Sequence, residues 1–269
     1  MKDSQLKKIY FTSSWDDGSV NDLKLLKLLN KYNIKGTFYV PKEFDGKGSK
    51  FSEYNRQLSD KEIIEIASGQ EIGSHSLTHR SLVSLDEKDI KEEMAGSKIY
   101  LENIIGRQVE MLCPPNGLFD ERVTKIAGDA GYLGMRTTKK LSFKLSQNKP
   151  FGLDVSIICN PFPFRKKDSS KIYWRRASDP IKGYGGKILS FPTIYFNLFS
   201  WPSFAKAFFR YVIKNGNYFH LYGHSWELEK YQMWNELEDF LKYVKEFYNI
   251  EYLTNSQIVE LLNHENSNS

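Results

Sequence analysis

Residues 9–18, IYFTSSWDDG, decide the fold. The apolar and β-favouring first part of this stretch predicts a strand, and Asp16 and Asp17 follow directly at its end. Leucines then recur at helical spacing across residues 21–32, and residues 36–40 predict a second strand. A strand, a helix and a second strand in this order form the unit from which parallel sheets are built.

The same alternation continues along most of the chain. Further strands are expected at residues 71–74, 109–112, 132–137, 217–224 and 251–254, with helices at 59–67, 84–105, 120–130, 203–214, 235–248 and 256–262. Residues 139–202 hold six of the nine prolines, so we expect an irregular insertion there. The pattern predicts one α/β domain over residues 1–269, with a core of about 9–262 and a parallel sheet that is open or closed into a barrel.

Composition excludes several classes of protein. The chain has 269 residues, of which 40% are hydrophobic, so it can bury a core and is neither disordered nor fibrous. The net charge of +5 is spread along the sequence and does not indicate a nucleic-acid partner. Two cysteines give no disulfide framework. The sequence shows no signal peptide or membrane span, and we expect a cytoplasmic protein.

Acidic residues and histidines follow three of the predicted strands. Asp16 and Asp17 end the first strand, His75 and His79 follow the third, and His224 ends the strand nearest the C-terminus. Because the carboxyl ends of parallel strands meet at one edge of a sheet, we expect these five side chains to lie together.

The two histidines suggest a metal site. A spacing of four places His75 and His79 on one face of a helical turn, where they could share a cation, although the spacing alone fits an ordinary surface or core position equally well. A carboxylate from another strand end would complete three ligands. Two histidines, one carboxylate and an open position form a hydrolytic zinc centre.

The remaining polar groups fit proton transfer. Acids before a helix can simply favour its dipole, which accounts for one of the pair. Adjacent residues leave a strand end in different directions, so one acid can bind a metal while the other acts as general base. His224 could protonate a leaving amine because its pKa lies near neutrality. His220, two residues earlier, is expected to be a buried, hydrogen-bonded histidine.

Together these motifs resemble the polysaccharide deacetylase family, carbohydrate esterase family 4, also called the chitooligosaccharide deacetylase homology domain. Residues 14–18 (SWDDG) are similar to its first motif, Thr-Phe-Asp-Asp-Gly, and residues 36–40 (GTFYV) to the strand that follows it. Residues 72–79 (IGSHSLTH) resemble the second motif, residues 113–117 (CPPNG) the third, and residues 221–224 (LYGH) the last.

The resemblance implies a distorted (β/α) barrel of about seven parallel strands, with the active site at their C-terminal ends. It implies removal of an N-acetyl or similar acyl group from a sugar or glycoconjugate. It also implies a divalent metal, most commonly Zn²⁺, with Co²⁺, Ni²⁺ or Fe²⁺ as alternatives. Asp17, His75 and His79 would hold this metal, while Asp16 would be the base and His224 the acid.

The sequence departs from the family pattern at two motifs. Cys113 stands where the third motif has an arginine that orients the base, and the fourth motif, an Asp before a Trp, is not visible. Arg136 could reach the same edge and replace the lost guanidinium, although an ordinary surface arginine is an equal alternative. Glu227 could orient His224.

Four further positions are candidates for substrate binding. The turn at Pro115 and Asn116 would supply a backbone N–H to the developing oxyanion. Tyr222 and Trp226 could stack on a sugar ring, whereas Trp15 is expected in the core.

Three other functions compete with this hypothesis. They are a deformylase or ureide hydrolase on the same metal centre, an inactive sugar-binding module, and a non-haem iron oxygenase. The oxygenase would leave Asp16 and His224 unexplained.

Overall fold

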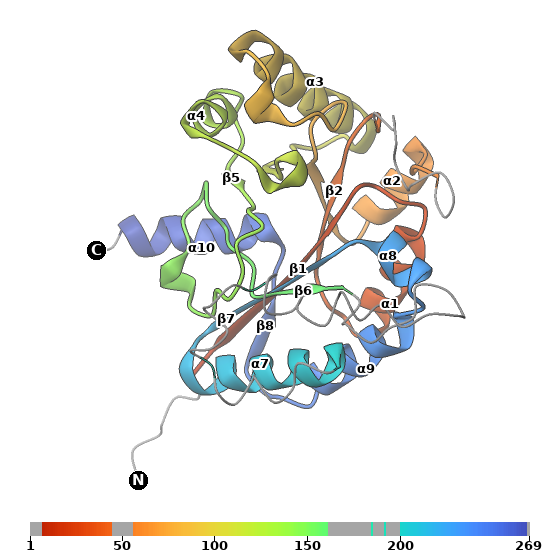
Figure 1. Ribbon diagram of the computed structural model, residues 1–269, viewed down its shortest axis with the longest axis vertical. Coiled ribbons are helices and arrows are strands. Elements are labelled where there is room, and N and C mark those ends of the chain that lie inside the picture. Colours follow the sequence, from red (N-terminus) through yellow and green to blue (C-terminus); the bar gives the residue numbers. More distant parts are fainter. Residues whose placement is uncertain (1–6, 45–55, 161–183, 185–190, 192–199, 268–269) are drawn as a thin grey trace.

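A curled sheet of parallel strands forms the centre of the molecule, and helices cover its outer face (Figure 1). The structure, a computed structural model, describes residues 7–44, 56–160, 184, 191 and 200–267. The strands are β1 (Ile9–Asp16), β2 (Thr37–Val40), β3 (Glu71–Ser74), β4 (Met111–Leu112), β5 (Gly134–Met135), β6 (Ile157–Cys159), β7 (Tyr218–Gly223) and β8 (Ile250–Tyr252). Seven of them follow the order β5-β4-β3-β2-β1-β7-β6, and β8 pairs with β1. The predicted distorted barrel of about seven parallel strands is confirmed.

Helices connect successive strands, as the sequence alternation predicts. They are α1 (Asp22–Lys31), α2 (Asp60–Ala67), α3 (Glu87–Ile105), α4 (Glu121–Asp129), α7 (Trp201–Asn215), α8 (Ser225–Lys230), α9 (Trp234–Val244) and α10 (Asn255–Ser267). Short 3₁₀ turns occupy Leu82–Ser84, Pro115–Gly117 and Leu145–Gln147. In the described ranges no helix combines the length and the apolar character needed to cross a bilayer.

The barrel closes through irregular backbone instead of a regular strand pair. The predicted strand at residues 132–137 shortens to Gly134–Met135. Beyond it, Leu153 donates to the Met135 carbonyl at 2.9 Å, and Ser156 donates to the His220 carbonyl at 2.9 Å. The segment before β6 therefore links β5 to β7. Much of the expected insertion at 139–202 lies outside the described residues.

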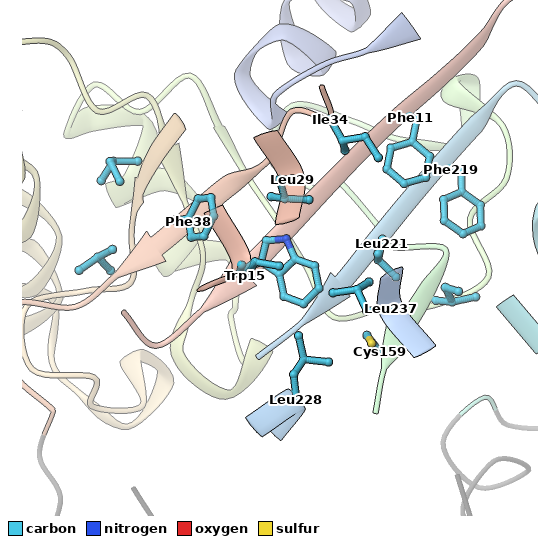
Figure 2. Close-up of a cluster of buried hydrophobic side chains, with 14 of the residues drawn as sticks. Phe11, Trp15, Leu29, Ile34, Phe38, Cys159, Phe219, Leu221, Leu228 and Leu237 are labelled. Carbon is cyan, nitrogen blue, oxygen red and sulfur yellow. The ribbon is translucent and has the colours of Figure 1, made fainter. Parts of the chain in front are cut away.

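Side chains alternate along β1 between two different surroundings. Phe11 and Trp15 face the helices, and Trp15 is fully buried there, as expected for a core residue (Figure 2). Thr12 and Asp16 face the barrel interior, which is filled largely by polar and aromatic side chains. Alternation thus directs one acid of the first motif into the barrel.

Helix α10 closes the end of the barrel away from the site. Its first residue, Asn255, accepts a hydrogen bond from Thr12 Oγ1 and donates one to Tyr39 Oη, both at 2.8 Å. Ile258 and Val259 pack in the same buried cluster as Tyr39. The opposite end, where the strands terminate, carries the candidate site residues.

Candidate active site

The two adjacent acids after β1 have different surroundings because the backbone reverses between them. Asp16 ends the strand, whereas Asp17 and Gly18 both adopt left-handed conformations, with φ of 82° and 62°. A non-glycine residue in this region costs about 1–2 kcal/mol. Such strain persists where the surrounding structure holds it, commonly at functional sites. Here it turns the Asp17 carboxylate away from the barrel interior and towards two histidines.

Asp17, His75 and His79 form a cluster with metal-binding geometry. The Asp17 Oδ1 atom lies 3.5 Å from His75 Nε2 and 3.4 Å from His79 Nε2. A tetrahedral ion with bonds of about 2.0–2.1 Å separates its ligand atoms by roughly 3.3–3.4 Å. The donor set and its spacing therefore fit a divalent ion such as Zn²⁺.

The surroundings of His75 prepare it to bind a metal. Its Nδ1 lies 2.7 Å from the Cys113 carbonyl oxygen, so that nitrogen carries the proton and donates it. The other nitrogen, Nε2, is then free to accept a metal on the side of Asp17. A carbonyl behind a metal-binding histidine is the usual way to fix its tautomer and ring orientation.

A second possible ligand set, Asp16, His75 and Cys113, is less suitable. The distance from His75 Nε2 to Asp16 Oδ2 is 4.0 Å, longer than that to Asp17. Asp16 Oδ1 is also ion-paired with the buried Arg136 guanidinium. A dication next to that guanidinium would be repelled, so Asp17 is the better ligand.

The loop that carries both histidines is not helical, so the predicted helical turn is wrong. Ser76 and His79 are left-handed, with φ of 65° and 58°. The loop is held by the Glu93 carboxylate, which accepts hydrogen bonds from the backbone N–H groups of Leu77 at 2.9 Å and Thr78 at 2.8 Å. The Glu93 side chain on α3 therefore accepts the backbone hydrogen bonds that carbonyl groups would accept in a helix.

Glu93 was missed by the motif analysis, although the sequence contains a signal for it. The residue is 1% exposed and shares the buried face of α3 with Ile90, Met94 and Ser97. A carboxylate on an otherwise buried helix face needs partners. Here they are the loop amides, the Thr78 hydroxyl and the Arg80 guanidinium.

Arg136 lies beside Asp16 and is fully buried, which excludes the surface alternative. Its guanidinium carbon lies 4.3 Å from the centre of the Tyr222 ring and 5.2 Å from that of Tyr39. Burial alone would lower the pKa of Arg136, but the Asp16 carboxylate keeps that pKa well above its ordinary value. Cys113 Sγ lies 3.7 Å from the other oxygen of Asp16. The Arg136 guanidinium thus lies beside Asp16, where the sequence analysis expects a replacement for the third-motif arginine.

His224 lies on the opposite side of Asp17 and is oriented by Glu227. Its Nδ1 is 3.0 Å from Glu227 Oε2, and its Nε2 is 3.8 Å from Asp17 Oδ2. Burial lowers the pKa of His224, but the Asp17 and Glu227 carboxylates outweigh burial and raise the pKa to about 9. A cation on Asp17 would offset part of that increase.

His220 is the buried histidine that the sequence predicts. Its ring nitrogens lie 2.8 Å from Tyr218 Oη and 2.8 Å from Ser14 Oγ. Burial and the nearby Arg136 hold its pKa well below the ordinary value, so the ring stays neutral.

The aromatic candidates have contacts within the site itself. Trp226 donates its indole N–H to Asp17 Oδ2 at 2.9 Å, which leaves Oδ1 directed at the histidines. Tyr222 is 6% exposed and its ring is covered by Arg136, so it offers little surface to a sugar. Pro115 is buried and Asn116 is exposed, in the turn that follows β4.

A further buried carboxyl, that of Asp22 on α1, lies outside the sequence motifs. Burial, together with the charges of Asp17 and Asp16, raises its pKa to about 8. It is therefore mostly neutral at pH 7 and adds little negative charge to the site.

Comparisons with known proteins concern the family and the fold. Residues 3–135 match the family model described as polysaccharide deacetylase. The match covers just under half of the chain, and this part of the chain is similar to the polysaccharide deacetylase family. The peptidoglycan-N-acetylmuramic acid deacetylase PdaA of Bacillus subtilis is 31% identical over 129 residues, which cover 47% of this chain and 44% of that protein. The chain spans less than half of the length of the curated relatives that it matches.

Solved structures extend the fold similarity to nearly the whole chain. A protein from Mycobacterium smegmatis assigned to the polysaccharide deacetylases aligns over 99% of this chain and 94% of its own, with a TM-score of 0.67 and 17% identity. A family 4 acetyl xylan esterase from Clostridium thermocellum, in complex with a cobalt ion, aligns over 94% of this chain and 91% of its own. Its TM-score is 0.55 and its identity 16%, so the likeness concerns the fold.

Replacing His79 with Ala should lower zinc affinity by at least about 100-fold, because it removes one of three protein ligands. Cys113→Ser should leave that affinity within about threefold, since the sulfur lies in the alternative ligand set. Isothermal titration of metal-free protein with ZnCl₂ measures both. If Cys113→Ser lost most of its zinc affinity and His79→Ala lost none, the metal would instead be bound by the set of Asp16, His75 and Cys113.

Glu93→Ala should lower zinc affinity by about 10–100-fold, the usual effect of losing support behind metal ligands. Glu92→Ala, an exposed neighbour on the same helix, is the matched control and should bind zinc like the unmodified chain. Circular dichroism checks that both variants fold. If Glu93→Ala and Glu92→Ala bound zinc with equal affinity, Glu93 would not support the metal site.

Arg136→Met should lower the free energy of unfolding by about 3–5 kcal/mol, because it leaves the buried Asp16 charge unpaired. Adding Asp16→Leu should restore a large part of that loss, since the unpaired charge is then gone. Urea denaturation of the single and double variants measures the coupling. Simple additivity of the two changes would mean that the pair does not interact.

Proposed function

We propose that this chain is a metal-dependent hydrolase that removes an N-acetyl group from a sugar unit of a glycan or glycoconjugate. The observation that carries the proposal is the separation of its two adjacent acids. Asp17 lies with two histidines, while Asp16 lies outside that set and is held by Arg136. The family-model match over residues 3–135 and the similarity to a peptidoglycan deacetylase support the same reaction.

A divalent ion fits Asp17, His75 and His79, most simply Zn²⁺, with Co²⁺, Ni²⁺ or Fe²⁺ as alternatives. When bound, such an ion polarises a carbonyl oxygen and makes water acidic enough to attack near neutral pH. The protein holds its ligands in place through the Cys113 carbonyl behind His75 and the Trp226 indole on Asp17.

Asp16 is the general base in this proposal. Its carboxylate lies within 4.0 Å of His75 Nε2, close to the metal ligands but outside their set. Arg136 forms a buried ion pair with the carboxylate and holds it in one orientation. The family resemblance gives this task to an arginine of the third motif. Cys113 stands at that position here, and Arg136, the residue directly after β5, provides the guanidinium.

His224 is the general acid. An amide nitrogen leaves poorly as an anion, so it must gain a proton as the C–N bond breaks. Glu227 orients the ring, and the carboxylates around His224 favour its protonated form. The backbone N–H of Asn116, in the turn after Pro115, would bind the oxyanion, and Trp226 would contact the sugar.

Two alternatives use the same scaffold. A deformylase or ureide hydrolase would share the metal ligands but release formate or ammonia. An inactive sugar-binding module would have no use for a base paired with a buried arginine or an acid oriented by a carboxylate.

Acetate release tests the function directly. With Zn²⁺ or Co²⁺ and N-acetylated chito-oligosaccharides or peptidoglycan fragments, the unmodified chain should release acetate, and Asp16→Asn should lower the rate by about 100–10,000-fold. Parallel assays for formate and ammonia should stay negative. Release of formate or ammonia alone, or no turnover with either metal and glycan, would refute the proposal.

Glu227→Gln should move the alkaline limb of the rate profile to lower pH. His224 must be protonated to act as acid, so activity falls as pH rises through its pKa. Removing the Glu227 charge lowers that pKa, and the fall should begin about one pH unit earlier. Glu229→Gln, a nearby exchange outside the site, should leave the limb in place. If the alkaline limb of Glu227→Gln did not move, His224 would not be the group whose deprotonation limits the rate.

A further inference from the structure

Tyr222 lies between the two proton-transfer groups of the proposed active site. It belongs to β7, comes two residues before His224 and is 6% exposed. Its ring centre lies 4.3 Å from the guanidinium carbon of Arg136, and its hydroxyl oxygen lies 3.3 Å from Nε2 of His224. Because Arg136 is paired with Asp16, one side chain contacts both the partner of the proposed base and the proposed acid.

The Tyr222 hydroxyl can pair with His224 in both protonation states of the imidazole. The Glu227 carboxylate, 3.0 Å from Nδ1, only accepts hydrogen bonds, so Nδ1 carries a proton. A protonated Nε2 donates to the Tyr222 oxygen, and a deprotonated Nε2 accepts from the Tyr222 O–H. Burial and the Asp16 charge raise the pKa of the Tyr222 hydroxyl well above its usual value, so the hydroxyl keeps its proton. At 3.3 Å this contact is longer than an ordinary hydrogen bond, so Nε2 can exchange it for a leaving nitrogen.

The Tyr222 ring is a principal contact of the Arg136 guanidinium. Among the residues that the structure describes, Arg136 Nε has no hydrogen-bond partner, and Nη1 reaches only the Thr137 carbonyl, at 3.5 Å. The guanidinium is therefore held mainly by Asp16 and by aromatic rings, of which that of Tyr222 is nearer than that of Tyr39, at 5.2 Å. A cation at the face of a tyrosine ring is stabilised, and more strongly where water is excluded.

We propose that Tyr222 is a positioning residue for both proton transfers: its hydroxyl holds the His224 ring, and its own ring holds the guanidinium that orients Asp16. This inference rests on the proposed function, because it takes Asp16 as the base and His224 as the acid. It gives Tyr222 a task other than the sugar stacking that the sequence suggests. The hydroxyl and the ring then have separate effects, and the hydroxyl matters only where the leaving group needs a proton.

Two kinds of substrate separate the hydroxyl from the ring. N-acetylated chito-oligosaccharides or peptidoglycan fragments release an amine, which needs a proton from the acid, whereas 4-nitrophenyl acetate releases 4-nitrophenolate, which leaves as an anion. With the zinc-loaded chain, Tyr222→Phe should lower kcat for the N-acetyl substrate by about 3–10-fold, the range for one neutral hydrogen bond, and leave KM unchanged. Its rate with 4-nitrophenyl acetate, counted as the part that Asp16→Asn abolishes, should stay that of the unmodified chain.

Two further variants complete the comparison. Tyr222→Leu also removes the ring, so it should lower the ester rate as well, by about 3–10-fold. Tyr218→Phe is the matched control, because it removes a hydroxyl that bonds to His220 on the same strand, and it should keep both rates. Circular dichroism checks that each variant folds, and Tyr222→Phe decides the role of the hydroxyl even if Tyr222→Leu does not fold.

The outcomes separate this inference from the proposed function. Tyr222→Phe with the same N-acetyl kcat as Tyr218→Phe, or with equal losses on both substrates, would overturn the inference and spare the proposed function. So would an ester rate that a folded Tyr222→Leu leaves intact, or a rise in KM with kcat unchanged, as expected if the hydroxyl bound the sugar. If the unmodified chain released no acetate from any N-acetyl substrate, the proposed function would fail and the inference with it.

Discussion

Asp17 leaves the extended backbone immediately after β1, and the layout of the site depends on that reversal. In a continuing strand, Asp16 and Asp17 would point to opposite faces of the sheet, and Asp17 would enter the helix-facing core. Because Asp17 and Gly18 adopt left-handed conformations, the Asp17 carboxylate lies instead at the end of the barrel. Two neighbouring acids can then serve different tasks, one beside the histidines and one beside Arg136.

The barrel interior provides a partner for the nearly fully buried carboxyl group of Asp16. A buried carboxylate without a partner is strongly unfavourable, and Arg136 provides that partner. The guanidinium in turn lies against the rings of Tyr39 and Tyr222, which favour a cation at their faces. Deeper in the barrel, His220 and Asn255 continue this polar packing with all their partners in place. The site is therefore supported from below by satisfied polar groups.

The sequence predicts a parallel α/β sheet because strand and helix periodicity are local signals, whereas its closure into a distorted barrel is what the resemblance to the family implies. The sequence also predicted that Asp17, His75 and His79 would meet, since strand ends of a parallel sheet share one edge. It failed on the loop between the two histidines, whose shape is set by Glu93 from a distant helix. Burial of Arg136 could not be decided locally either, because it depends on β1, β2 and β7 packing around it.

The sequence predicts least well the roles of aromatic side chains that could either bind substrate or contact other site residues. The sequence suggests sugar stacking for Trp226, yet its indole N–H donates to the carboxylate of Asp17, the proposed metal ligand. Tyr222 was assigned to the same task and lies over Arg136. Motif spacing places such residues near the site but does not tell which atom faces which partner.

X-ray absorption spectroscopy of the zinc-loaded chain tests most directly whether Asp17 binds the metal while Asp16 stays free to act as base. We expect a first shell of nitrogen and oxygen neighbours at about 2.0–2.1 Å, with scattering from two imidazoles and no sulfur. A sulfur neighbour at about 2.3 Å would place the ion on Cys113 and Asp16 and would contradict the assignment of Asp17 as ligand and Asp16 as base.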